Sequence, residues 1–221
     1  MTDIKEMMQM QKRHFEMETD GFYGAYWKCK TDSDCAMIAM IGDDSEDYLA
    51  RTSVKWLHKL GVNVMTMSPA KKDYGHHNYP LERIEKAISW LKTHGNRKIG
   101  IVGASTTGTL ALTAASYFED ITLTIGLTPS DFIWQGFMQG KRDGCKEWPM
   151  EGESLFSYKE EPLPYMPFCY KHPDYWHVIE KETKRTGDMI NSRKLFDDSE
   201  KAHTITEDEM IKIEKIHGTL L

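Results

Sequence analysis

The feature that most constrains this chain is a regular alternation of short apolar runs and amphipathic helical patterns from residue 35 to residue 127. Continuous apolar runs are typical of strands buried on both faces, and apolar residues at helical spacing indicate the helices between them. The expected strands are 35–41, 62–67, 99–102 and 121–127, and the expected helices are 47–60, 80–94 and 107–118. The apolar face of the first helix is expected to hold Leu49, Val54, Leu57 and Leu60. Such alternation predicts βαβ units and a mostly parallel sheet, so the fold class is α/β.

An antiparallel hairpin is expected ahead of this pattern. The segments 14–18 and 22–27 flank Thr19-Asp20-Gly21, a short polar turn that ends in glycine. Two apolar-rich segments around a turn of this kind predict a pair of antiparallel strands. The α/β sheet should therefore carry an N-terminal hairpin.

A long stretch of different composition follows the last expected strand. Residues 131–207 hold five of the eight prolines and twelve of the 24 aromatic residues of the chain. Insertions of this length within a domain are usually functional, and the aromatic content favours a folded cap over a linker. The predicted organisation is a core at 1–130, a cap insertion at 131–207, and the start of a further core strand at 208–221.

Composition excludes several classes of protein. The 221 residues carry a formal net charge of −6 without a basic cluster, which argues against a nucleic-acid partner. No apolar run approaches the roughly 18 residues that a membrane span needs, and the first residues do not resemble a signal peptide. A cytoplasmic protein is therefore expected. Four scattered cysteines include no C-x-x-C pair, so neither a metal site nor a cofactor is expected.

The strongest chemical signal is Gly103-Ala104-Ser105-Thr106-Thr107-Gly108, where a buried strand turns directly into a helix. This context is that of a nucleophile elbow, which projects a serine hydroxyl above the carboxyl ends of the strands. The N–H of Thr106 at the helix start would stabilise an oxyanion there. Thr107 stands where the usual G-x-S-x-G pattern has its second glycine. The alternative interpretation is a glycine turn with an incidental serine.

A second oxyanion donor is expected in the loop after the strand 35–41. Gly42 permits a close backbone approach, and the N–H of Asp43 is the candidate donor. The alternative is a turn that caps the next helix, with Asp44 or Ser45 as N-cap. Both interpretations can hold together, because a backbone donor leaves the side chains free.

Gly42 and three further residues that follow strands are candidates for the substrate rim. His76 and His77 come after the strand 62–67, and as adjacent residues they form a poor metal site. Asp131 follows the strand 121–127, where some α/β-hydrolases carry their catalytic acid. The alternative for Asp131 is an N-cap at the start of a helix in the cap.

Three stretches, 100–105, 121–130 and 209–218, carry a resemblance to a known family. The chain resembles the acyl-CoA thioester hydrolase / bile acid-CoA:amino acid N-acyltransferase C-terminal domain family, whose members are α/β-hydrolases related to dienelactone hydrolases. The resemblance implies an α/β-hydrolase-type sheet with Ser105 as nucleophile. Members that transfer acyl groups to amino acids tend to have cysteine at this position, so serine implies hydrolysis. The implied partner is a small-molecule substrate, either an acyl thioester such as an acyl-CoA or an ester.

The same resemblance places the acid and the histidine of the triad after strands that follow His217, beyond Leu221. The chain is therefore expected to be truncated within its sheet and, taken alone, to lack a complete triad. Two alternatives stay open: a binding protein of this fold without catalysis, and a carboxylesterase or dienelactone-type hydrolase. An unfinished sheet edge would also favour a homo-oligomer.

Overall fold

The computed structural model of the chain comprises two compact units. It describes residues 12–42, 44–69, 75–139, 147–169, 181, 185 and 190–221. Unit 1 is formed by Met1–Lys71, Leu81–Asp131 and Lys212–Leu221, and unit 2 by Lys72–Pro80 and Phe132–Ile211. Unit 2 is thus inserted into the sequence of unit 1 at two points.

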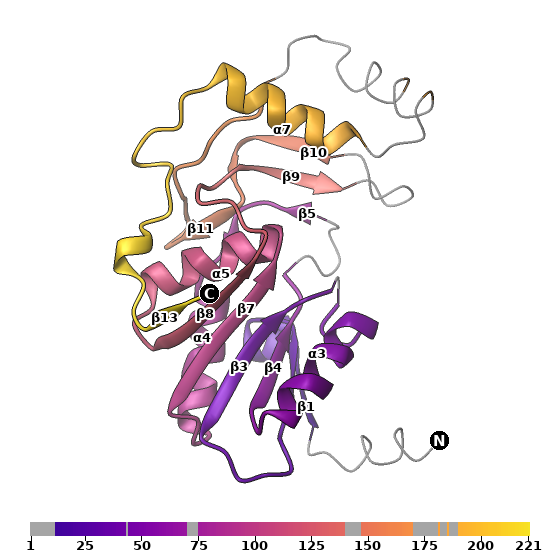
Figure 1. Cartoon of the computed structure of the whole chain (residues 1–221), viewed down its shortest axis with the longest axis vertical. Helices are drawn as coiled ribbons and strands as arrows, with labels where there is room; N and C mark the ends of the chain where they lie inside the picture. Colours follow the sequence, from indigo (N-terminus) through magenta and orange to yellow (C-terminus); the bar gives the residue numbers. More distant parts are fainter. Residues whose placement is uncertain are drawn as a thin grey trace. The chain divides into compact units, whose positions relative to one another are not determined.

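Unit 1 is built on a seven-stranded sheet (Figure 1). Its strands are β1 (Lys12–Phe15), β2 (Gly24–Trp27), β3 (Cys35–Met40), β4 (Asn63–Met67), β7 (Lys98–Ala104), β8 (Ile121–Leu127) and β13 (Thr219–Leu220). The strand order is β1-β2-β4-β3-β7-β8-β13. β1 pairs with β2 and β2 with β4 in the antiparallel sense, and the other neighbours are parallel. The expected α/β-hydrolase-type sheet with an N-terminal hairpin is therefore confirmed.

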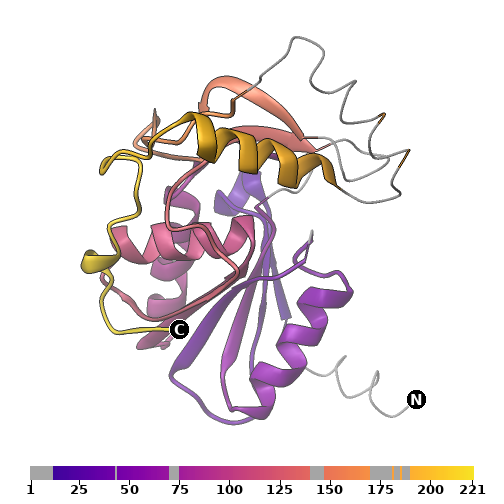
Figure 2. The ribbon, with the colours of Figure 1, turned by 45° about the horizontal axis from the view of Figure 1, so that its top comes forward.

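Helices cover both faces of this sheet. They are α2 (Met17–Asp20), α3 (Tyr48–Lys59), α4 (Glu82–Thr93) and α5 (Thr106–Tyr117), with a short 3-10 helix η1 (Ile213–Lys215) before β13. α3 lies on one face, and α4 and α5 lie on the other (Figure 2). This arrangement follows from the βαβ connections, which place crossover helices against the sheet. No helix in the described part of the chain is both long and apolar enough to cross a membrane.

The core of unit 1 forms because alternate strand residues meet the apolar faces of the helices. Under α3, Val54 and Leu57 pack on Met37 of β3, Val64 of β4 and Val102 of β7, all of which are buried. β3 is buried on both faces, as its continuous apolar run predicted. The sheet therefore holds the ends of β3 and β7 rigidly, and these two ends carry the predicted site.

The expected apolar face of α3 was wrong at two positions. Val54 and Leu57 are buried, whereas Leu49 is 51% exposed and Leu60 is 70% exposed. The buried face is instead completed by Ala50 and Ser53. Small residues there bring the helix close to the sheet, and positions 50, 53, 54 and 57 have the spacing of one helical stripe.

The described residues of unit 2 include two small sheets and the helix α7. Its elements are β5 (Gly75–His76), β6 (Tyr79–Pro80), β9 (Gln135–Gln139), β10 (Glu147–Ser154), β11 (Phe156–Tyr158), β12 (Glu161–Pro162) and α7 (Ile190–Ala202). The sheets have the orders β10-β9-β5 and β12-β11-β6. Trp134 packs on Phe168 and Phe196 with ring centroids 5.4 and 4.7 Å away. The aromatic residues of the insertion thus form a core of their own.

Candidate active site

Ser105 is the single residue between the end of β7 and the start of α5. Its backbone has φ 53° and ψ −122°, a region that non-glycine residues rarely occupy. Two hydrogen bonds hold it there: its N–H donates to the carbonyl of Leu127 at 2.8 Å, and its carbonyl accepts from Thr109 N–H at 3.0 Å. The side chain is exposed. The chain therefore adopts the sharp strand-to-helix turn that the motif predicted.

Two glycines allow this turn to close. A Cβ atom at Gly103 would lie 1.9 Å from the carbonyl oxygen of Thr107, so a side chain there is sterically excluded. At Gly108 a Cβ would lie 3.2 Å from the carbonyl oxygen of Leu127 and 3.3 Å from that of Gly103. Gly108 thus gives α5 its close approach to the sheet, although it stands one residue later than in the usual pattern.

Thr106 is the first residue of α5. The first N–H groups of a helix have no acceptor within the helix, and the helix dipole favours negative charge beside them. Because Thr106 directly follows Ser105, its N–H is the nearest such donor along the chain. The described geometry places a backbone N–H at a helix start directly after an exposed serine.

The loop after β3 begins with Ile41 and Gly42, and Asp43, the predicted second donor, lies outside the described residues. Gly42 has φ 102°, and a Cβ there would lie 2.4 Å from either carboxylate oxygen of Asp47. Asp47 is the N-cap of α3, because its carboxylate accepts from Ala50 N–H at 2.8 Å. The expectation that Asp44 or Ser45 caps this helix was therefore wrong. The helix begins later, at Tyr48, so the capping residue is also later.

Two threonine hydroxyls fix the elbow to its neighbours. Thr107 Oγ1 lies 2.9 Å from Ala104 N and 2.5 Å from the carbonyl oxygen of Met40 at the end of β3. Thr109 Oγ1 accepts from the N–H of Ser130 at 3.0 Å. The sequence motif alone does not predict this role for Thr107, which stands where the usual pattern has a glycine. The signal that could have identified it is a hydroxyl residue in the first turn of the helix, where such side chains bond to nearby backbone.

His76 and His77 lie in unit 2, whereas Ser105, Gly42 and Asp131 lie in unit 1. His76 is on β5 opposite Phe137, and its Nδ1 is shielded from solvent without a hydrogen-bond partner. Burial lowers the pKa of His76 to about 4, and the nearby His77 adds to this shift. The Nδ1 of His77 lies 2.7 Å from the carboxylate of Glu153. Both side chains are therefore engaged within unit 2.

Asp131 is exposed and is the last residue of unit 1 before the insertion. The alternative that it caps a helix was wrong, because the described residues 132–139 contain no helix and lead into β9. A strand forms there since residues 135–139 pair with β10 and β5. An exposed aspartate after β8 stays a candidate for the substrate rim.

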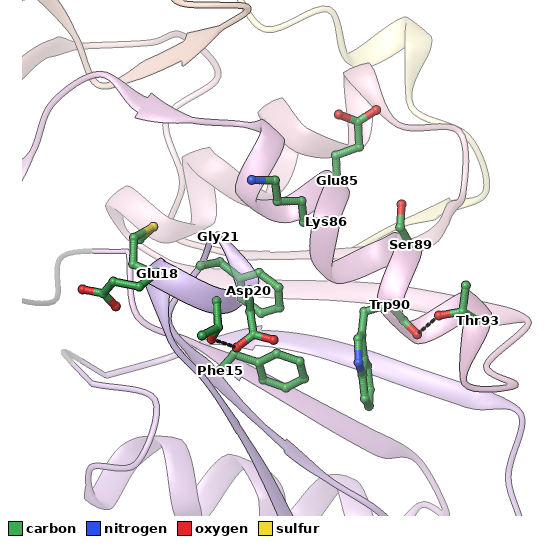
Figure 3. A pocket seen from close by; sticks show the side chains of 12 residues that line it. Phe15, Glu18, Asp20, Gly21, Glu85, Lys86, Ser89, Trp90 and Thr93 are labelled. Carbon is green, nitrogen blue, oxygen red and sulfur yellow. Dashed lines mark hydrogen bonds between the residues drawn. The ribbon is translucent and has the colours of Figure 1, made fainter.

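A pocket of about 760 Å³ lies in unit 1 beside the hairpin, lined by residues of α2 and α4 (Figure 3). Phe15 and Trp90 give it apolar walls, and Asp20 and Lys86 give it charged ones. None of the predicted site residues is among those that line it. The pocket is therefore separate in sequence and in lining from the Ser105 turn.

The family described as "BAAT / Acyl-CoA thioester hydrolase C terminal" matches residues 79–221, which is more than half of the chain. The chain belongs to this family. The match includes Ser105, Thr106 and Asp131 and excludes Gly42 and His76. Among curated proteins, none matches this member of the BAAT / acyl-CoA thioester hydrolase family.

Several solved esterases are similar to this family member. A cold-adapted esterase from an Arctic intertidal metagenomic library is 18% identical with a TM-score of 0.45, over 53% of this chain and 60% of the esterase. Est1E from Butyrivibrio proteoclasticus is 20% identical with a TM-score of 0.43, over 53% of this chain and 50% of Est1E. The Pyrococcus furiosus esterase Pf2001 is 19% identical with a TM-score of 0.46, over 57% of this chain and 54% of the esterase. The chain therefore spans 50–60% of these proteins.

Proposed function

We propose that this protein is a serine hydrolase that cleaves acyl thioesters, or esters, through an acyl-enzyme on Ser105. The observation that carries the proposal is the backbone of Ser105, which is strained at φ 53° and yet presents an exposed hydroxyl. Strained backbone conformations cluster at functional sites, because the surrounding structure must maintain them at a cost of about 1–3 kcal/mol. An incidental serine would not require this conformation.

The proposed reaction follows from the groups around the turn. The hydroxyl oxygen of Ser105 attacks the acyl carbonyl carbon, its proton passes to a base, and the thiol or alcohol leaves. Water then hydrolyses the acyl-enzyme. The Thr106 N–H stabilises the oxyanion that forms in each step. One such donor lowers the activation free energy by about 2.7–4 kcal/mol in enzymes with an oxyanion hole.

The described histidines of unit 1 each have a contact elsewhere. His58 Nε2 lies 3.2 Å from the carbonyl of Trp27, and His94 Nδ1 lies 2.8 Å from the carbonyl of Trp90. His14 bonds to Glu46 at 2.9 Å, and His217 Nε2 is 3.8 Å from Glu119. The proposal therefore assigns the nucleophile and its donor, and it assigns the base to none of these four.

Family membership supports the substrate class. A family of acyl-CoA thioester hydrolases suggests a thioester carbonyl, and a serine in place of cysteine suggests water as the final acceptor of the acyl group. We further propose that unit 2 is the cap of this hydrolase and that Asp131 of unit 1 lies at the substrate rim. Its aromatic core around Trp134 would give an inserted segment the rigidity that a cap needs.

The test is labelling of the full natural protein with a fluorophosphonate probe, followed by mass spectrometry of the labelled peptide. We expect stoichiometric labelling at Ser105 and a loss of at least about 10³-fold in kcat for an acyl-CoA substrate in Ser105→Ala. Rates on an acyl-CoA and on a matched oxygen ester separate thioesterase from carboxylesterase. A folded protein that the probe does not label would instead identify a binding protein without catalysis.

A further inference from the structure

We propose that Thr107 is a positioning residue for Ser105, because its hydroxyl ties the nucleophile turn to the end of β3. The inference rests on the proposed function of Ser105 and adds a requirement to it. Thr107 is the second residue of α5, and Met40 is the last residue of β3. The hydroxyl joins two segments that are 67 positions apart in sequence.

Two hydrogen bonds through the Thr107 hydroxyl, together called the relay, link the ends of β3 and β7. Met40 and Gly103 are the final register pair of β3 and β7. One residue further along β7, the N–H of Ala104 donates to Thr107 Oγ1 at 2.9 Å. The hydroxyl in turn donates to the Met40 carbonyl at 2.5 Å. A side-chain oxygen thus joins an N–H and a carbonyl that belong to neighbouring strands.

The single hydrogen of the Thr107 hydroxyl is used in this pair of hydrogen bonds. Its oxygen also lies 2.9 Å from the Ala104 carbonyl, but a hydroxyl has one hydrogen, and the Met40 carbonyl is the nearer acceptor. The hydroxyl hydrogen is directed to the Met40 carbonyl and not to a base that would activate the oxygen as a nucleophile. Thr107 therefore holds the site in place, and Ser105 stays the only nucleophile of the proposal.

The two backbone groups that the relay joins belong to Ala104 and Met40, and parts of the proposed site follow each of them directly in the chain. Ser105 and Thr106 come directly after Ala104, and the loop that begins with Ile41 and Gly42 comes directly after Met40. Gly42 is itself held at φ 102° against the carboxylate of Asp47. The Thr107 hydroxyl consequently sets the distance between the nucleophile turn and the start of this loop. A glycine at position 107, as in the usual motif, would have no hydroxyl to do so.

The neighbouring threonines of α5 show that this contact is particular to Thr107. Thr109 Oγ1 accepts from Ser130 N–H at 3.0 Å, on the side of the turn that faces the exit of β8. Thr113 Oγ1 donates to the carbonyl of Thr109 at 2.8 Å, a bond within the helix. Thr113 is buried, with 1% of its surface exposed, so it offers a matched control for loss of a buried hydroxyl.

The experiment compares Thr107→Val, Thr107→Ser and Thr113→Val in the full natural protein. Valine keeps the shape of threonine and removes the hydroxyl, whereas serine keeps the hydroxyl. We expect Thr107→Val to lower kcat and the fluorophosphonate labelling rate by about 10- to 100-fold with KM within about threefold, because misplacement of catalytic groups acts on the transition state. Thr107→Ser and Thr113→Val should stay within about threefold of wild type.

Thermal unfolding midpoints of the same variants distinguish an effect on the position of Ser105 from an effect on stability. Thr107→Val should lose at least as much stability as Thr113→Val, because it removes the partner of both the Ala104 N–H and the Met40 carbonyl, and only Thr107→Val should lose rate. Thr107→Ala gives a second hydroxyl-free variant if the valine variant does not fold, and it should show the same loss of kcat. Equal losses of rate in the 107 and 113 variants, or no recovery with serine, would overturn the inference. A wild-type protein that the probe does not label would overturn the proposed function first.

Discussion

The turn at Ser105 and the histidine pair at the end of β5 were both singled out because polar residues follow a strand, yet the fold treats them differently. Ser105 is exposed on a backbone with φ 53°, held by hydrogen bonds to Leu127 and Thr109. His76 has its Nδ1 shielded from solvent, and His77 is bonded to Glu153 at 2.7 Å. One region presents an exposed serine, and the other holds its polar side chains in partly buried contacts.

The difference shows what makes a polar residue after a strand a candidate for catalysis. At the Ser105 turn, the sheet ladder, two glycines and two threonine hydroxyls maintain a backbone conformation that costs free energy. At β5, the His76 ring packs against Phe137, and the Nδ1 of His77 lies within hydrogen-bond distance of Glu153. Both regions follow a strand in the sequence, and the backbone geometry and the exposure of the side chains distinguish them.

The largest loss of stability is expected from Gly103→Ala, which places a side chain in the Ser105 turn. The new Cβ would lie 1.9 Å from the carbonyl oxygen of Thr107, and neither backbone segment can move without opening the turn. We expect the free energy of unfolding to fall by about 3 kcal/mol or more, measured by urea denaturation.

Gly95→Ala is the matched control for that variant. Gly95 has φ 86°, and a Cβ atom added there would have nothing within 4 Å, so alanine adds only conformational strain of about 1 kcal/mol. Equal losses for the two alanine variants would contradict the view that close packing holds the Ser105 turn.

The second prediction concerns the pH dependence of the stability of unit 2, which should arise from His76. The pKa of His76 is lowered by burial to about 4 from its ordinary 6.5, so the unfolded chain binds a proton in a pH range where the folded protein does not. The stability of unit 2 should therefore be greatest above about pH 6.5 and fall by about 2–3 kcal/mol as the pH is lowered to 4. Denaturant unfolding across this range measures the slope.

His76→Phe removes this titration and should flatten the dependence between pH 6.5 and 4. His217→Gln removes an exposed histidine of unit 1 and should leave the dependence as it is in the wild type. An unchanged slope in His76→Phe would show that the shielded ring does not control acid stability.

The smallest effect is a gain in stability from Ser105→Gly. Glycine adopts φ 53° without steric cost, so the variant should be more stable than wild type by about 1 kcal/mol while its reaction with a fluorophosphonate is lost. Ser105→Ala keeps the Cβ and therefore the strain, so it should lose the reaction without the gain. A glycine variant less stable than the alanine variant would argue against strain at this turn.

Local patterns in the sequence were sufficient for most of the fold. β8 has the expected bounds 121–127, and the other expected strands and helices formed within a few residues of their predicted ends. Pro80 was expected to open a helix, but it pairs with Ser157 as part of β6, and α4 begins at Glu82. Leu49 and Leu60 were expected in the core and are exposed. The first error arises because a pairing partner far along the chain sets where the helix begins. The second arises because the orientation of the helix on the sheet sets which of its residues are buried.

The sequence by itself determined the α/β class, the N-terminal hairpin and the place of the strand-to-helix turn at Ser105. These depend on hydrophobic periodicity and turn residues, which act over a few positions. Only the tertiary structure decided that Asp47 caps α3 against Gly42, that the Nδ1 atom of His76 is shielded from solvent, and that Thr107 reaches Met40 across 67 positions. The physical reason is that a hydrogen bond or a buried ring depends on which strands become neighbours, and no local pattern in one sequence encodes that distance.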